Sequence, residues 1–135
     1  MNADFRVDHI SIAVRDLAAS ARFYGETLGL TEIENKTGLA HIRWFAFDAN
    51  RAIHLIGGRD EPPPERPMTA HFCLSTPAFD ETLKALGERG VKYMNLSREP
   101  GRYSLRGDGV RQTYFQDPDN HWVEVCEANP DGTVG

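Results

Sequence analysis

Two segments of this sequence share a pattern that restricts the possible folds. In Val7–Val14 and again in Met68–Ser75, apolar residues alternate with polar ones, and a histidine stands at an equivalent place in each. Alternation with a period of two predicts a strand with one buried face. Each segment precedes a helical stretch and then further strand-like segments. The chain is therefore interpreted as one β-α-β-β-β module used twice, with His9 and His71 in corresponding positions.

Turn residues and apolar spacing predict the individual elements. Asp16 is expected to cap a helix that ends near Leu28, and Thr76-Pro77 a second one that stops near Gly90. The predicted strands are, in chain order, Val7–Val14, Thr31–Lys36, Ala40–Phe47, Arg51–Ile56, Thr69–Ser75, Val91–Leu96, Val110–Gln116 and His121–Glu127. Residues Ser97–Gly109 are expected to form a loop.

Composition limits the classes of protein to which this chain can belong. It has 135 residues with a net charge of −5, which predicts one domain without a basic surface for nucleic acid. No apolar run reaches the roughly 20 residues that span a bilayer, and Met1–Arg6 does not look like a signal peptide. Cys73 and Cys126 are expected to be reduced core thiols of a cytoplasmic protein. Proline-rich residues 59–67 predict a linker between module 1 (1–58) and module 2 (68–135).

Four polar residues fall on the strand faces opposite the apolar ones: His9, His54, His71 and Glu124. The helices need the apolar faces, so these residues are expected on a concave inner surface. An unpaired buried carboxylate is costly, whereas two imidazoles and a carboxylate form a ligand set for Fe, Mn, Ni, Co or Zn. Two other interpretations stay open: each histidine can be an ordinary strand residue, and Glu124 can be a strand-edge carboxylate or the partner of Arg111.

Three motifs resemble the vicinal-oxygen-chelate superfamily, which includes glyoxalase I, bleomycin-binding proteins and extradiol dioxygenases. They are His9 in an opening strand, Phe23–Leu30 (FYGETLGL), and Tyr114–Val125 (YFQDPDNHWVEV). The resemblance implies an α+β fold, in which two modules form a cup-shaped, mostly antiparallel eight-stranded sheet with helices on the outer face. It also implies a metal held by His9, His71 and Glu124, and a homodimer.

His54 is the residue that separates the members of the superfamily. Glyoxalase-like enzymes usually have a carboxylate or amide ligand at this position, whereas extradiol dioxygenases have an acid–base histidine and a tyrosine ten residues before the glutamate. The resemblance thus favours a ring-cleaving dioxygenase with Fe(II), in which His54, Tyr114 and Glu124 are catalytic. The alternatives are a glyoxalase I-like lyase with Ni, Zn, Co or Mn, and a non-catalytic binding protein. In the last case a small planar ligand would contact the aromatic residues Trp44, Phe45, Phe47, Tyr103 and Trp122.

Overall fold

Each half of the chain forms a four-stranded mixed sheet, and a helical segment packs against that sheet. The structure is a computed structural model that describes residues 3–132. It contains two compact units, Met1–Pro63 and Pro64–Gly135, which we describe separately. The predicted linker at 59–67 stays a prediction.

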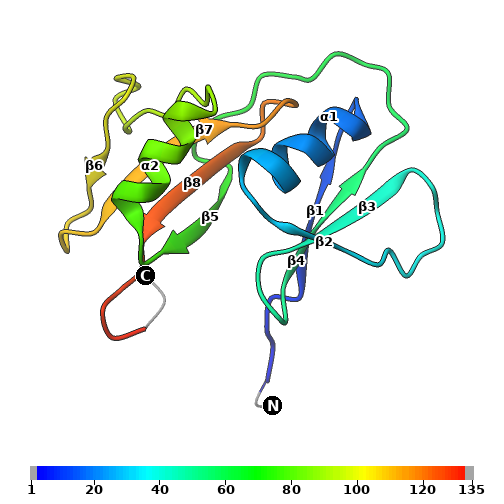
Figure 1. Ribbon diagram of the computed structural model, residues 1–135, viewed down its shortest axis with the longest axis horizontal. Helices are drawn as coiled ribbons and strands as arrows, with labels where there is room; N and C mark the ends of the chain where they lie inside the picture. Colours follow the sequence, from blue (N-terminus) through cyan, green and yellow to red (C-terminus); the bar gives the residue numbers. More distant parts are fainter. Residues whose placement is uncertain (1–2, 133–135) are drawn as a thin grey trace. The chain divides into compact units, whose positions relative to one another are not determined.

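The first unit has the strand order β1-β4-β3-β2 (Figure 1). Its strands are β1 (His9–Ala13), β2 (Thr31–Ile33), β3 (Ile42–Ala46) and β4 (Ala52–Ile56). β1 runs parallel to β4, and the other two pairs are antiparallel. The predicted strands are therefore present, although each is shorter than predicted.

The helical segment of the first unit begins where the sequence predicts. The carboxylate of Asp16 accepts a hydrogen bond from the backbone N–H of Ala19 at 3.0 Å, and α1 (Leu17–Arg22) follows. The last part is a π-helical turn, η1 (Phe23–Thr27), rather than a continued α-helix. It packs closely on the sheet, since a Cβ on Gly25 would lie 3.0 Å from the Phe45 ring.

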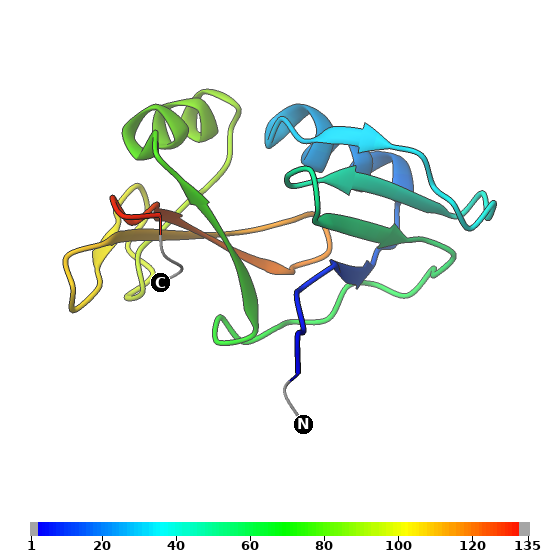
Figure 2. The ribbon, with the colours of Figure 1, turned by 90° about the horizontal axis from the view of Figure 1, so that it is seen from below.

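The second unit repeats this topology with the strand order β5-β8-β7-β6 (Figure 2). Its strands are β5 (His71–Thr76), β6 (Ser104–Leu105), β7 (Arg111–Gln116) and β8 (Trp122–Glu127). As in the first unit, the edge strand β5 runs parallel to its neighbour β8, and the other two pairs are antiparallel. Both units thus contain the β-α-β-β-β order, and the α+β fold class is confirmed.

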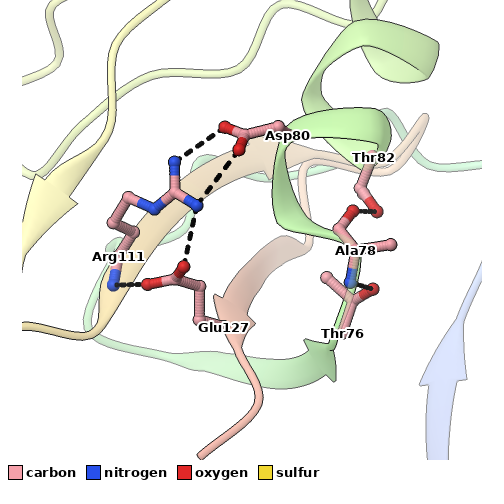
Figure 3. A network of polar contacts seen from close by, with 6 residues as sticks. All are labelled: Thr76, Ala78, Asp80, Thr82, Arg111 and Glu127. Atoms are coloured by element: carbon pink, nitrogen blue, oxygen red, sulfur yellow. Dashed lines mark hydrogen bonds and ion pairs between the residues drawn. The ribbon is translucent and has the colours of Figure 1, made fainter.

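A polar network fixes α2 (Phe79–Glu88) to the sheet of the second unit (Figure 3). The Arg111 guanidinium on β7 donates to Asp80 in the first turn of α2 at 2.7 Å and to Glu127 on β8 at 2.7 Å. The Thr76 hydroxyl accepts from the N–H of Ala78, the residue that precedes the helix. Arg111 therefore links one helix to two strands.

Three predictions about the elements of the second unit are wrong. Val91–Leu96 is not a strand: only Met94 makes isolated bridges, to Pro100 and Tyr114, because the tight turn of Asn95–Glu99 diverts the chain. The third position in the module is filled by β6, inside the segment predicted as a loop. In addition, α2 begins at Phe79, because Thr76 still belongs to β5.

The cores of the two units lie between the sheets and their helices. Tyr24, Ile53 and Leu55 are fully buried in the first unit, and Phe115 and Val123 in the second. Within residues 3–132, no helix is long and apolar enough to cross a membrane.

Candidate functional site

In the second unit, the predicted site residues share one face of the sheet. Glu124 on β8 pairs in register with Cys73 of β5 and with Tyr114 of β7. Residues opposite each other on neighbouring strands project to the same side, and so does His71, two positions before Cys73. Val123 and Val125 project to the other side, where α2 packs. The face assignment made from the alternation is therefore correct for this unit.

His71 is oriented by a backbone carbonyl. Its Nδ1 lies 2.7 Å from the carbonyl oxygen of Met68, which can only accept, so Nδ1 donates. In the neutral imidazole this leaves the lone pair on Nε2, which faces Glu124 Oε2 at 3.7 Å. Histidines that bind metals are oriented in this way, with one nitrogen bonded to a carbonyl and the other free.

Glu124 is buried, and both of its carboxylate oxygens have neighbours. The side chain is 7% exposed. Its Oε1 accepts a hydrogen bond from the Tyr114 hydroxyl at 2.6 Å and another from the Gln112 amide. Oε2 is left facing His71. The open interpretation of Glu124 as the partner of Arg111 is wrong, because Arg111 pairs with Asp80 and Glu127.

Tyr114 is held in its protonated form. Burial, and then the hydrogen bond to Glu124, raise the pKa of Tyr114 above its ordinary value. Because its hydroxyl proton is directed at Glu124, Tyr114 orients that carboxylate in this structure. Gln112 does the same, and the sequence analysis did not identify it. Its position two residues before Tyr114, on the same strand face, was the available signal.

In the first unit, His54 lies between two flat rings. Its imidazole stacks on His9 with ring centroids 4.0 Å apart and planes 13° apart. On its other side it stacks on Trp44, again at 4.0 Å and with planes only 3° apart. Ser11 of β1 and Trp44 of β3 are the register neighbours of His54, so these side chains lie on one face. His9 also pairs with Asp8, with 2.8 Å between Nδ1 and Oδ2.

The stack changes the electrostatics of His54. Burial, and then the neighbouring charge of His9, lower the pKa of His54, although Asp8 acts in the opposite direction. The Nε1 atom of Trp44 is buried and has no hydrogen-bond partner within residues 3–132. The imidazole is therefore favoured in its neutral form, beside an indole whose N–H is unsatisfied.

The donor atoms of the second unit suit a transition metal. Metal–ligand bonds of about 2.0–2.2 Å for nitrogen and oxygen add to more than the 3.7 Å between His71 Nε2 and Glu124 Oε2. One ion can therefore contact both atoms. In the first unit, the parallel rings of His9 and His54 direct their lone pairs along separate planes, so these two residues cannot both bind one ion in this arrangement.

The structure thus brings the predicted residues together in two pairs: His71 with Glu124, and His9 with His54. In the part of the chain that the structure describes, no three histidine, cysteine, aspartate or glutamate side chains come together as a metal site. The complete set of His9, His71 and Glu124 stays a prediction.

Three further predictions about side chains need correction. Cys73 is exposed on the sheet face and is not a core residue, whereas Cys126 is buried as expected. Although Cys73 is exposed as a residue, partial burial of its sulfur, and then hydrogen bonds to Glu124 and Cys126, raise the pKa of the Cys73 thiol. Phe45 and Tyr103 do not lie on the polar faces: Phe45 packs against η1, and Tyr103 packs against Phe79 of α2 at 5.9 Å.

Comparison with known proteins identifies the family. The model of the Glyoxalase/Bleomycin resistance protein/Dioxygenase superfamily matches residues 6–125, almost the whole chain. The chain belongs to this superfamily. The resemblance predicted from the motifs is thereby confirmed, as is the α+β fold class, which here consists of two four-stranded mixed sheets and their helices.

Individual relatives within the superfamily are distant. "Glyoxylase I 4" of Arabidopsis thaliana is 27% identical over 131 residues, which cover 91% of this chain and 71% of that protein. The structure titled "Oxidase ChaP-H1" has a TM-score of 0.70 at 26% identity, covering 96% of this chain and 99% of the other. A glyoxalase/dioxygenase from Nostoc punctiforme has a TM-score of 0.68 at 25% identity, covering 94% and 97%. Members of the superfamily typically use divalent metals, and they include both lyases and oxidases.

Proposed function

We propose that this protein is a metal-dependent enzyme that binds a small substrate through two adjacent oxygen atoms, and that it is an extradiol-type ring-cleaving dioxygenase. His9, His71 and Glu124 would hold the ion, Fe(II) in this activity. The observation that carries the proposal is the His71–Glu124 pair. The Met68 carbonyl fixes the His71 imidazole, the Glu124 carboxylate is buried, and His71 Nε2 lies 3.7 Å from Glu124 Oε2.

His54 supports a dioxygenase over a glyoxalase I-like lyase. A lyase of the glyoxalase type would use this position as a further ligand. The stack with His9 prevents both imidazoles from binding the same ion, so His54 is left to accept and release a proton. Its lowered pKa favours the neutral imidazole, the form that a general base requires.

Glu124 and Tyr114 complete the proposed catalytic group. When bound, the metal would supply a Lewis acid to the two substrate oxygens. Glu124 would neutralise charge at the ion, and Tyr114 would hold Glu124 in place through its 2.6 Å hydrogen bond. The lone pairs of the Tyr114 oxygen can also accept a hydrogen bond from a protonated group on the substrate.

Oxygen uptake is the test of this proposal. Protein loaded anaerobically with Fe(II) should consume oxygen when a panel of catechols is added. His54→Ala should retain the iron and lose about 10²-fold or more in turnover, as expected for a general acid–base group. Oxygen-independent turnover of α-hydroxycarbonyl adducts with Ni, Co, Zn or Mn would contradict the dioxygenase and favour the lyase. Loss of iron from His54→Ala would show that His54 is a ligand.

The setting of the activity is also part of the proposal. We infer a homodimer in the cytoplasm, a reducing compartment that suits the free thiols of Cys73 and Cys126. Light scattering of the purified protein tests the dimer: a mass of one chain would contradict it.

A further inference from the structure

The proposed mechanism leaves two sulfur atoms without a role, although they lie side by side. Cys73 Sγ on β5 and Cys126 Sγ on β8 are 3.3 Å apart, and the first thiol donates to the second. Both cysteines are free, Cys73 exposed and Cys126 buried. An exposed thiol in contact with a buried one is the arrangement in which the first can be oxidised from solution and the second can then displace the oxidant.

The two cysteines lie on the same face of β5 and β8 as His71 and Glu124. Cys73 lies two residues after His71 and opposite Glu124, while Cys126 lies two residues after Glu124 and opposite Ser75. The cysteines are therefore diagonal neighbours on adjacent parallel strands. With strands about 4.8 Å apart and a rise of about 3.3 Å per residue, their Cα atoms are separated by about 8 Å. A relaxed disulfide spans about 4.4–6.8 Å between Cα atoms.

Closing a disulfide here thus requires β5 and β8 to move relative to each other. His71 and Glu124 are on these same two strands, two residues from the sulfur atoms. We propose that Cys73 and Cys126 are a reversible disulfide site, whose oxidation displaces His71 from Glu124. The consequence for metal binding rests on the proposed function; the disulfide itself does not. A strained disulfide is also easily reduced, as a reversible site requires.

The oxidant we infer is a low-molecular-weight disulfide such as oxidised glutathione. The Cys73 thiol loses its proton, and the thiolate attacks the oxidant, forms a mixed disulfide and releases one glutathione, which takes up a proton; the raised pKa of Cys73 makes this step slow. The sulfur of Cys126 then attacks the Cys73 sulfur, which forms the protein disulfide and releases the second glutathione. The protein loses two electrons and two protons, and both protons end on the glutathione thiols. No other reactant is needed.

Mass spectrometry after alkylation tests the site. The protein is incubated in glutathione buffers of increasing oxidised fraction and then alkylated. We expect the wild type to lose both alkylation sites and to recover them in dithiothreitol. Cys126→Ser should stop at a glutathione adduct on Cys73, and Cys73→Ser should not react, because Cys126 is buried. Wild type that keeps both thiols in fully oxidised buffer, or that accumulates only the adduct, would overturn the proposal.

Two readouts test the displacement of His71. Cobalt(II) titration followed by absorbance should show that the affinity of the oxidised protein for cobalt is lower by about tenfold or more. This is the range found when groups that orient metal ligands are lost. The imidazole NMR resonances of His71 should shift on oxidation without any metal present. Unchanged resonances would overturn the displacement. If the reduced protein binds no cobalt, the proposed function fails, while the NMR result still decides this inference.

Discussion

At the scale of single residues, the environment of His54 depends on Trp44. The indole covers one face of the imidazole at 4.0 Å, and His9 covers the other. The Trp44 N–H is buried without a partner in the described part of the chain. An unsatisfied buried donor costs about 1–3 kcal/mol, so the buried N–H group of Trp44 lowers the stability of the fold.

Two substitutions of Trp44 separate the ring from its N–H group. Trp44→Phe keeps a flat ring beside His54 and removes the unsatisfied donor, so we expect the free energy of unfolding to change by no more than about 1 kcal/mol. Trp44→Ala removes the ring, and we expect a loss of about 2–4 kcal/mol, slightly below the value for fully buried aromatics because Trp44 is partly exposed. Urea denaturation measures both. Equal losses in the two variants would show that the stack is not what stabilises this site.

Tyr114 gives a second prediction at this scale. Tyr114→Phe removes one of the two hydrogen bonds to Glu124 Oε1 and leaves the bond from Gln112. We expect the free energy of unfolding to fall by about 1.5–3 kcal/mol, the usual contribution of a hydrogen bond to a charged group. Tyr103→Phe is the matched control, because Tyr103 is 44% exposed and its ring contacts survive the change. An unaffected Tyr114→Phe variant would contradict the role assigned to this hydroxyl.

At the scale of helices and strands, Arg111 joins α2 to β7 and β8 (Figure 3). Its guanidinium also lies over the rings of Phe79 and Tyr103, at 4.7 and 5.3 Å from their centroids. The hydrogen bonds from Arg111 are the largest cause of the lowered pKa of Asp80 and of Glu127. The network therefore makes stability depend on pH.

The direction of this dependence follows from the two carboxylates. A carboxyl group whose pKa is lower in the folded state stabilises the fold above its unfolded pKa, and this contribution is lost as the pH falls through the folded pKa. Arg111→Met should therefore lower the urea midpoint at about pH 6, and the difference from wild type should shrink toward about pH 2–3. A difference that stays constant over this range would mean that Arg111 acts through packing on Phe79 and not through its charge.

The contact between η1 and the sheet gives another prediction. Gly25→Ala would place a Cβ 3.0 Å from the ring of Phe45, which is 2% exposed and has little room to move. We expect a loss of about 1–2 kcal/mol from overpacking. Gly107→Ala is the control, since no atom lies within 4 Å of the added Cβ. Melting temperatures of the two variants test this, and equal values would contradict close packing at Gly25.

The strand faces could be predicted from the sequence, whereas some element boundaries could not. Alternation with a period of two assigns His71 and Glu124 to one face whatever the exact strand ends are. Val91–Leu96 has a strand-like composition, but only Met94 pairs there, because the Asn95–Glu99 turn is stabilised by side-chain hydrogen bonds. β6 has only two residues, too few for a periodic pattern.

At the scale of the whole molecule, the β-α-β-β-β module occurs twice, and each copy supplies two of the four predicted site residues. The pattern of each copy was therefore enough to predict its own pair. His9 and His54 come together in the first unit, and His71 and Glu124 in the second. Their partners could not be predicted in the same way. Stacking of Trp44 on His54, the amide of Gln112 and the contact between the two thiols depend on side-chain conformations, and strand patterns do not specify these.

The central claim is that His71 and Glu124 hold a divalent transition metal, and elemental analysis tests it most directly. Protein purified without chelators should contain a stoichiometric amount of metal, by mass spectrometry with an inductively coupled plasma source. His71→Ala and Glu124→Gln should each lose it, whereas His121→Ala, altered outside the proposed ligand set, should keep it. Wild-type protein without stoichiometric metal, or metal retained in both ligand variants, would contradict the account.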